Sequence, residues 1–204
     1  MTDIAEKSPT IGSRRLWIAA IVVAALQTAV LGYMVGERAW GLRSGVEILL
    51  RTAPVDPRDL LRGDYVTLNY DISRVPFSTM VEGPPKMSRS AAILSVRLKR
   101  QDDGYWGIVE SSFGKLDQKP DTVVLKSLPV EYVFYGDVTD PQQAIVGVTY
   151  GIERYYVPEG QGRDIESARN DNRVAIAARV SSDGVAHIRS LLLDGKSVYE
   201  EPLY

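Results

Sequence analysis

The stretch YVTLNYDI, residues 65–72, indicates the class of fold, because apolar and polar residues alternate along it. On an extended chain, one face would carry Val66, Leu68, Tyr70 and Ile72. The other face would carry the tyrosine, threonine, asparagine and aspartate between them. Alternation with a period of two is typical of a strand that is buried on one side, so the segment predicts a half-buried β-strand.

Several other segments share this strand-like composition. They are residues 46–52, 91–99, 105–112, 122–126, 130–138, 144–157, 173–181 and 185–193. Asp-Gly steps follow or join some of them, at 103–104, 183–184 and 194–195. Asp-Gly between two apolar runs favours a tight hairpin, since both residues tolerate positive φ. We therefore predict a mainly β domain, either an antiparallel sheet or a barrel-like arrangement.

The rest of this domain contains little helix. Residues 56–61 and 163–170 are the two short helical candidates, and residues 77–89, which are flanked or interrupted by prolines, predict a long loop. No internal repeat is evident in the sequence.

An uncharged segment, residues 16–36, lies near the amino terminus. About 20 apolar residues in a helix cross a hydrocarbon core, so we expect a membrane anchor. A cleaved signal peptide is the alternative, but its apolar region is usually shorter, about 7–15 residues. Lys7, Arg14 and Arg15 precede the segment, which favours a cytoplasmic amino terminus. The expected layout is a tail (1–15), an anchor (16–36) and an exported domain (41–204) in the periplasm or outside the cytoplasmic membrane.

Small residues fall on one stripe of this anchor, at Ala25, Ala29, Gly32 and Gly36. Gly32 and Gly36 make a GxxxG pair, which lets a second helix approach closely. The stripe predicts helix packing against a membrane-protein partner or a second copy of the chain.

Composition excludes several kinds of site. The chain has no cysteine and one histidine, His187, so thiol nucleophiles, His-rich metal cages and His-paired triads are excluded. With 24 basic and 26 acidic residues, the chain lacks the positive excess that nucleic-acid binding usually requires. We expect no cofactor, no metal and no nucleic-acid partner.

Charged side chains cluster just before the decisive strand. The candidate binding residues of this cluster are Asp56, Arg58, Asp59 and Arg62. Calcium could use Asp56, Asp59 and Asp64, but their spacing differs from that of a recognised calcium loop. A helix cap with surface ion pairs explains the same residues without metal.

The residues that follow carry a family resemblance. Gly63, Asp64, Tyr65, Leu68 and Tyr70 match all fixed positions of the motif that names the GDYXXLXY family, and residues 54–62 and 150–160 extend the likeness. The chain thus resembles bacterial membrane-anchored proteins of unassigned function, often encoded beside a polytopic membrane protein. The resemblance implies an amino-terminal anchor and a domain of unassigned function, and it implies no reaction.

Two hydrolase alternatives stay open. The Gly63–Val66 step resembles that of type I signal peptidases, although no serine precedes it at the spacing of that family. Thr52 carries the nearest hydroxyl, and Lys99 or Lys126 would have to act as the base. Two carboxylates from the group Glu153, Glu159 and Glu166 could instead act on a glycan, through Glu153 or Glu159. A peptide or glycan groove is a third option, lined by Tyr132, Phe134, Tyr155 and Tyr156.

We predict a non-catalytic accessory module, held in the bacterial cytoplasmic membrane by one helix and serving a neighbouring membrane protein. A membrane-tethered envelope hydrolase is the alternative.

Overall fold

The computed structural model describes residues 13–54, 65–83, 92–130, 144–156 and 162–200. Two compact units emerge, one comprising residues 1–39 with Tyr204 and the other Trp40–Leu203. Predictions that fall on 56–64, 131–138 or Glu159 lie outside the described residues.

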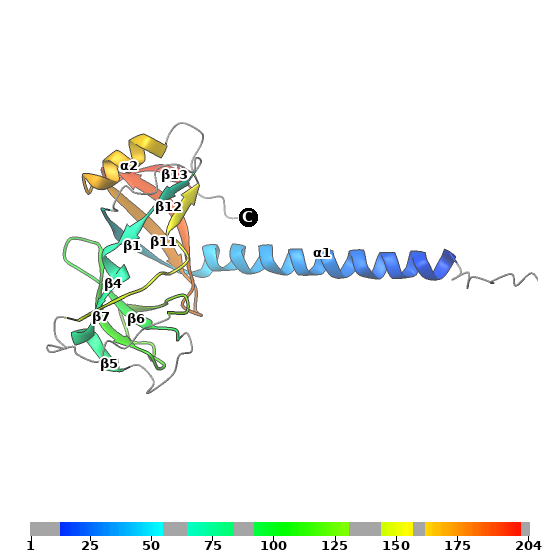
Figure 1. Cartoon of the computed structure of the whole chain (residues 1–204), viewed down its shortest axis with the longest axis horizontal. Helices are drawn as coiled ribbons and strands as arrows, with labels where there is room; N and C mark the ends of the chain where they lie inside the picture. The colour runs from blue at the N-terminus through cyan, green and yellow to red at the C-terminus, as the bar shows by residue number, and fades with distance from the viewer. Residues whose placement is uncertain (1–12, 55–64, 84–91, 131–143, 157–161, 201–204) are drawn as a thin grey trace, which may run out of the picture. The chain divides into compact units, whose positions relative to one another are not determined.

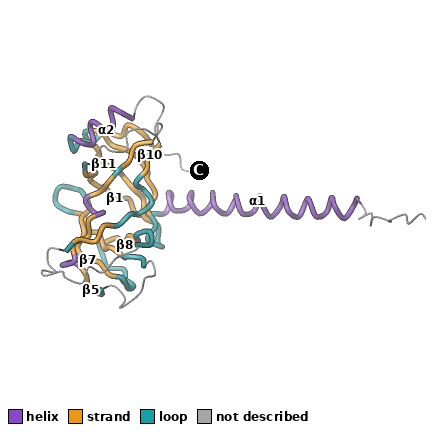
Figure 2. Tube along the Cα trace, in the orientation of Figure 1, coloured by secondary structure: helices purple, strands orange, loops and turns teal. Residues whose placement is uncertain are grey.

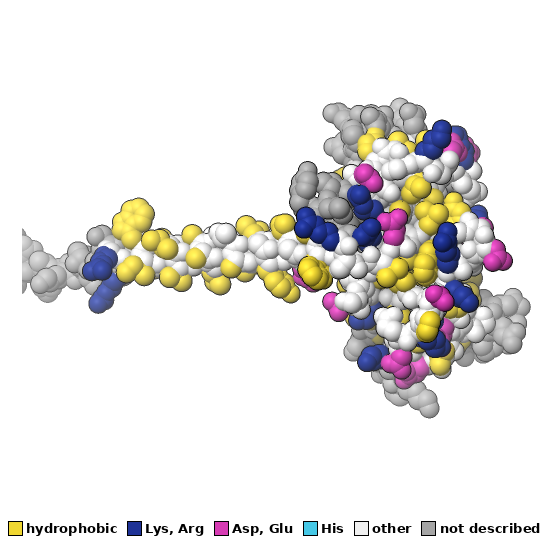
Figure 3. All heavy atoms as spheres, turned by 180° about the vertical axis from the view of Figure 1, so that it is seen from behind, with side chains coloured by type: hydrophobic (Ala, Val, Ile, Leu, Met, Phe, Trp, Pro, Cys, Tyr) yellow, Lys and Arg dark blue, Asp and Glu magenta, His cyan; other side chains and the backbone are white. Residues whose placement is uncertain are grey.

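The amino-terminal unit contains most of helix α1 (Ser13–Ser44), which includes and extends the predicted anchor. Residues 14–41 are long and apolar enough to cross a membrane, and none of the most apolar window is buried. Figure 3 shows hydrophobic side chains all along this helix and basic ones at its amino-terminal end. By length and composition, the helix fits a membrane anchor or a signal sequence.

The second unit is built mainly of strands, as predicted (Figure 2). A five-stranded sheet has the order β13-β12-β11-β1-β3 and a four-stranded sheet the order β5-β7-β6-β8. The strands of the first sheet are β1 (Val46–Ala53), β3 (Asn69–Tyr70), β11 (Val174–Val180), β12 (Ala186–Leu193) and β13 (Lys196–Glu200). Those of the second are β5 (Met80–Glu82), β6 (Ser95–Arg100), β7 (Trp106–Ser112) and β8 (Thr122–Lys126). Among the described residues these strands close no barrel.

Two short ladders form separate two-stranded sheets, β2 (Tyr65–Thr67) with β10 (Arg154–Tyr156) and β4 (Arg74–Pro76) with β9 (Ile145–Gly147). The 3₁₀ turns η2 (Asp71–Ser73) and η3 (Phe77–Thr79) flank β4, and helix α2 (Gly162–Asn170) lies where a helix was predicted. Figure 1 shows α2 at the end of the unit opposite β5. One apolar core includes side chains from both large sheets, with Leu50 and Leu98 fully buried.

Two predictions about strands need correction. The predicted loop 77–89 contains η3 and β5, because β5 pairs in parallel with β7. The predicted strand 144–157 is two strands, β9 and β10, because the chain turns at Gly151, whose φ is +82°. Such a φ interrupts an extended strand and is readily adopted only by glycine.

The domain also contains an internal repeat, contrary to the expectation from the sequence. Val180 pairs with Ala186 in the β11–β12 hairpin, just as Arg100 pairs with Trp106 in the β6–β7 hairpin. One constant shift along the chain converts every residue pair of the β6–β7 hairpin into a pair of the β11–β12 hairpin. The register irregularity that follows Arg97 in β6 recurs after Ala177 in β11. The Asp-Gly turns of the two hairpins, 103–104 and 183–184, obey the same shift.

The same shift relates the short ladders. Thr67 faces Arg154 in one ladder, and Gly147 faces Arg74 in the other. The bond from Leu68 N to Glu153 O (2.8 Å) has its equivalent from Val148 N to Ser73 O (2.9 Å). Reciprocal contacts of this kind define a local two-fold relation between residues 65–76 and 145–156.

Each large sheet combines strands from both repeats. β1 of the first repeat pairs with β11 of the second, and β8 of the second pairs with β6 of the first. Arg51 pairs with Ala175 in the five-stranded sheet, and Lys126 pairs with Ser95 in the four-stranded sheet. Because the shift between the hairpins relates Ser95 to Ala175, Arg51 and Lys126 occupy equivalent positions. The shift from β1 to β8 is slightly shorter than the shift that relates the hairpins. The two repeats are therefore intertwined, and neither contains a complete sheet alone.

Candidate functional site

Two residues of the GDYXXLXY motif, Leu68 and Tyr70, belong to the core. Leu68 and Tyr70 are at most 1% exposed, and the Tyr70 hydroxyl donates to Ile152 O at 2.5 Å. Burial, assisted by the negative charge of Glu153, raises the pKa of Tyr70 well above its ordinary value, so its hydroxyl remains a donor. Tyr65 begins β2, and Gly63 and Asp64 lie outside the described residues. The Leu-x-Tyr end of the motif therefore stabilises the fold.

The second repeat contains an equivalent tyrosine. The Tyr150 hydroxyl donates to Ile72 O at 2.7 Å, which mirrors the bond from Tyr70 to Ile152. Burial raises the pKa of Tyr150 as well. The Leu-x-Tyr of the motif recurs at 148–150 as Val-x-Tyr, whereas residues 143–145, Gln-Ala-Ile, replace Gly-Asp-Tyr. The internal comparison thus separates a shared structural half of the motif from a half unique to the first repeat.

Glu153 has a structural position beside this tyrosine. Its carboxylate accepts the backbone N–H groups of Tyr150 (2.5 Å) and Gly151 (2.9 Å). These bonds hold the turn that separates β9 from β10. Glu159, the other candidate carboxylate, lies outside the described residues, as do Asp56, Arg58, Asp59 and Arg62. The described residues contain no group of three or more side chains suited to a metal ion.

The proposed threonine nucleophile is also part of the fold. Thr52 is buried, and its hydroxyl donates to Val174 O at 2.7 Å within the five-stranded sheet. Lys99 and Lys126 are exposed and lie in the other sheet, on β6 and β8. The structure does not bring Thr52 into the same sheet as either lysine.

The remaining candidates are dispersed. Tyr155 is buried, with its ring centroid 6.3 Å from that of Tyr199, whereas Tyr156 is exposed; Tyr132 and Phe134 lie outside the described residues. His187 lies on β12 opposite Arg179. The small residues of α1, Ala25, Ala29, Gly32 and Gly36, are all exposed. A Cβ added at Gly32 or Gly36 would meet nothing within 4 Å, so this stripe is open.

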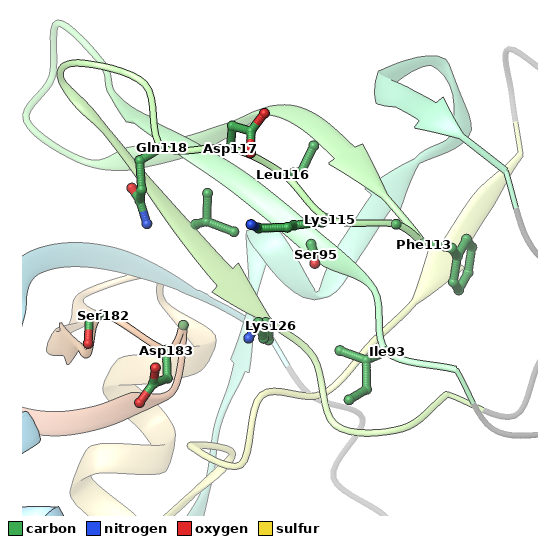
Figure 4. Close-up of a pocket in the computed structure, with 13 residues that line it drawn as sticks. Ile93, Ser95, Phe113, Lys115, Leu116, Asp117, Gln118, Lys126, Ser182 and Asp183 are labelled. Carbon is green, nitrogen blue, oxygen red and sulfur yellow. The ribbon is translucent and has the colours of Figure 1, made fainter.

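A pocket of about 660 Å³, not predicted from the sequence, lies on the polar face of the four-stranded sheet (Figure 4). It is lined by β6, β8, the segment after β7 and the turn between β11 and β12. The lining residues are Ile93, Ser95, Phe113, Gly114, Lys115, Leu116, Asp117, Gln118, Val124, Lys126, Ser182, Asp183 and Gly184. Ser95 and Lys126 face each other directly across neighbouring strands. Four separate segments contribute, so no local motif could have revealed the pocket.

An ion network stabilises the same face of this sheet. Arg97, which is 2% exposed, donates from Nε to Glu110 Oε2 at 2.5 Å, and Lys119 Nζ lies 3.0 Å from the same oxygen. Hydrogen bonds from Arg97 and then Lys119 hold the pKa of Glu110 below its ordinary value. Because Lys119 follows the pocket-lining segment 113–118, its bond to Glu110 holds that segment against the sheet.

No curated protein and no solved structure matches this chain. The model of the GDYXXLXY protein family matches residues 27–191, a range that includes the end of α1, both repeats and the pocket. The chain therefore belongs to the GDYXXLXY protein family.

Proposed function

We propose that this chain is a single-pass membrane protein whose β domain acts by binding, as an accessory module for a neighbouring membrane protein. Helix α1 supports the anchor, because its apolar side chains are exposed over more than the length that crosses a bilayer. A soluble domain rarely leaves such a surface uncovered.

The amino terminus would lie in the cytoplasm. Arg14 and Arg15 directly precede the apolar segment, whereas Glu37 accompanies Arg38 after it. Basic residues near a span tend to remain cytoplasmic, so the β domain would lie on the periplasmic or outer side of a bacterial cytoplasmic membrane.

One observation favours binding over catalysis: Thr52 and Glu153, two residues that the hydrolase alternatives require, are engaged in the fold. Both side chains bond to backbone groups. A nucleophile or general base must instead be able to reach a substrate. What the described domain offers to a ligand is an open pocket of mixed polarity.

Co-purification of the full chain from membranes after mild crosslinking tests the partner. The Gly32→Ile/Gly36→Ile variant blocks the close approach of a second helix, and Ala19→Ile/Ala20→Ile is the control, since these alanines lie away from the small-residue stripe. We expect one discrete membrane protein that is lost only with the glycine variant. A chain that crosslinks to no membrane protein in any form would contradict the proposal.

A membrane-tethered hydrolase is the second candidate, favoured by the Ser95–Lys126 pair in the pocket. A serine beside a lysine can act as nucleophile and base when the lysine is desolvated. Lys126 is exposed, which favours the binding function. A fluorophosphonate probe that labelled the wild type but not Ser95→Ala would establish the hydrolase and refute a purely binding role.

A further inference from the structure

The repeat supplies an internal comparison for the pocket. The equivalent corner of the domain, where β1, the β6–β7 turn and the β12–β13 turn replace the pocket-lining segments, is bridged by two ion pairs. Arg51 Nη2 lies 2.6 Å from Asp103 Oδ2, and the guanidinium lies over the Tyr105 ring at 4.3 Å. Arg173 binds Asp194 with two bonds, of 2.9 and 2.5 Å.

Neither ion pair has an equivalent among the described residues that line the pocket. Ile93 and Gly114 occupy the positions equivalent to Arg173 and Asp194, and neither carries a charge. Lys126 and Asp183 replace Arg51 and Asp103, but no ion pair joins them within the part of the chain that the structure describes. Among the described residues, one repeat therefore has a bridged corner, whereas the other lacks both bridges.

The stem of Lys126 packs on the glycine that follows Asp183. A Cβ on Gly184 would lie 3.0 Å from Lys126 Cγ, so the aliphatic part of the lysine packs on this glycine. Val185 stands in the position of Tyr105 and offers no aromatic ring to a cation. Figure 4 shows the Lys115 side chain extending across the cavity above Ser95 and the Lys126 side chain below Ser95. The Asp183 carboxylate is directed away from Lys126.

Two lysine amines therefore border the pocket without an ion pair among the described residues. Ser95, Ser182 and Gln118 add neutral hydrogen-bonding groups, and apolar walls come from Ile93, Phe113 and Leu116. Ammonium groups form their strongest hydrogen bonds with carboxylates and phosphates. Asp117 and Asp183 balance the charge of the lining, which disfavours a polyanion but leaves room for a single anionic group.

We propose that this pocket binds a small organic anion. Lys115 and Lys126 hold its carboxylate or phosphate group, and its apolar body packs on Ile93, Phe113 and Leu116. The proposal goes beyond the accessory function and does not depend on the identity of a membrane partner.

Titration calorimetry of the full-length protein in nonionic detergent tests the proposal. The probes are 4-phenylbutyrate and phenyl phosphate, with the neutral 4-phenylbutanamide as control, so the two anionic arms distinguish carboxylate from phosphate. We expect saturable binding of at least one anion and at least about tenfold weaker binding of the amide. The Lys115→Met/Lys126→Met variant should raise Kd for that anion at least about tenfold, which corresponds to a loss of about 1.4 kcal/mol.

Two further variants separate the pocket from a general effect of charge. Lys99→Met/Lys196→Met removes two exposed lysines elsewhere and should leave Kd unchanged. Lys126→Arg/Val185→Tyr keeps the charge but rebuilds the bridge seen in the other repeat, and should weaken binding severalfold. The proposal is overturned by the absence of binding for both anions, by equal binding of the amide, or by an unchanged Kd in the Lys115→Met/Lys126→Met variant.

Discussion

Removing either of the two equivalent tyrosine hydrogen bonds should lower the stability of the domain by a predictable amount. Tyr70→Phe removes the hydroxyl that donates to Ile152 O and keeps the fully buried ring. A buried polar group that loses its partner costs about 1–3 kcal/mol. We expect a loss of about 2 kcal/mol, which for a domain of this size lowers the melting temperature by about 4–8 °C.

The second repeat provides a matched test of the same reasoning. Tyr150→Phe removes the equivalent bond to Ile72 O and should destabilise the domain by a similar amount. Tyr105→Phe is the control, because no hydrogen bond of its hydroxyl occurs among the described residues and its ring still underlies Arg51. Thermal unfolding of the full-length protein is followed by near-UV circular dichroism. A Tyr70→Phe variant within about 0.5 kcal/mol of the wild type would refute the structural role of the motif.

Three further outcomes follow from the contacts of the domain, each measured by the same unfolding assay. Glu153→Ala should cost about 1–2 kcal/mol, because it leaves the amides of Tyr150 and Gly151 without their carboxylate, and an unchanged stability would exclude its role in the turn. Gly151→Ala should cost about 1 kcal/mol, since its φ of +82° strains any residue with a Cβ, and a stabilised variant would contradict that backbone conformation. Glu110 has a lowered pKa in the folded state, so its stabilising contribution should be complete above its unfolded pKa of about 4.5 and lost as the pH falls through the folded value. Glu110→Gln should therefore flatten stability against pH below about 5, and a parallel curve would contradict the Arg97 interaction.

The local features of the fold could be predicted from the sequence. Val66, Leu68 and Tyr70 alternate with less buried residues as the period-two pattern requires, and Asp194-Gly195 forms a hairpin turn with both φ values positive. Burial on one face and positive φ are properties of single residues and their neighbours, so a single sequence contains them.

The repeat could not be recognised in this way. Val66, Tyr70, Ile72 and Arg74 recur at the equivalent positions 146, 150, 152 and 154, but most other positions differ. Register in a sheet depends on which residues are buried and on backbone hydrogen bonds, and many sequences satisfy the same register. The shift that relates β1 to β8 also differs from the one that relates β6 to β11, which hides the repeat from a search at one spacing.

The candidate site was harder to predict for a related reason. The charged clusters of the sequence predict a site at Asp56–Asp64 or at Glu153. The Glu153 carboxylate instead binds the backbone of its own turn. The pocket depends instead on ion pairs that one repeat has and the other lacks, and that contrast requires the spatial alignment of Lys126 with Arg51.

The proposed membrane anchor, with the β domain outside the cytoplasm, can be tested directly because the chain contains no cysteine. Single cysteines introduced as Ser8→Cys in the tail and Asp102→Cys in the exposed β6–β7 turn can be labelled with a membrane-impermeant maleimide in intact bacterial cells. We predict labelling of the Asp102→Cys protein in intact cells, labelling of the Ser8→Cys protein only after the membrane is opened, and full-length chain in the membrane fraction. Labelling in the opposite order, or a shortened β domain released into the soluble fraction, would exclude this topology.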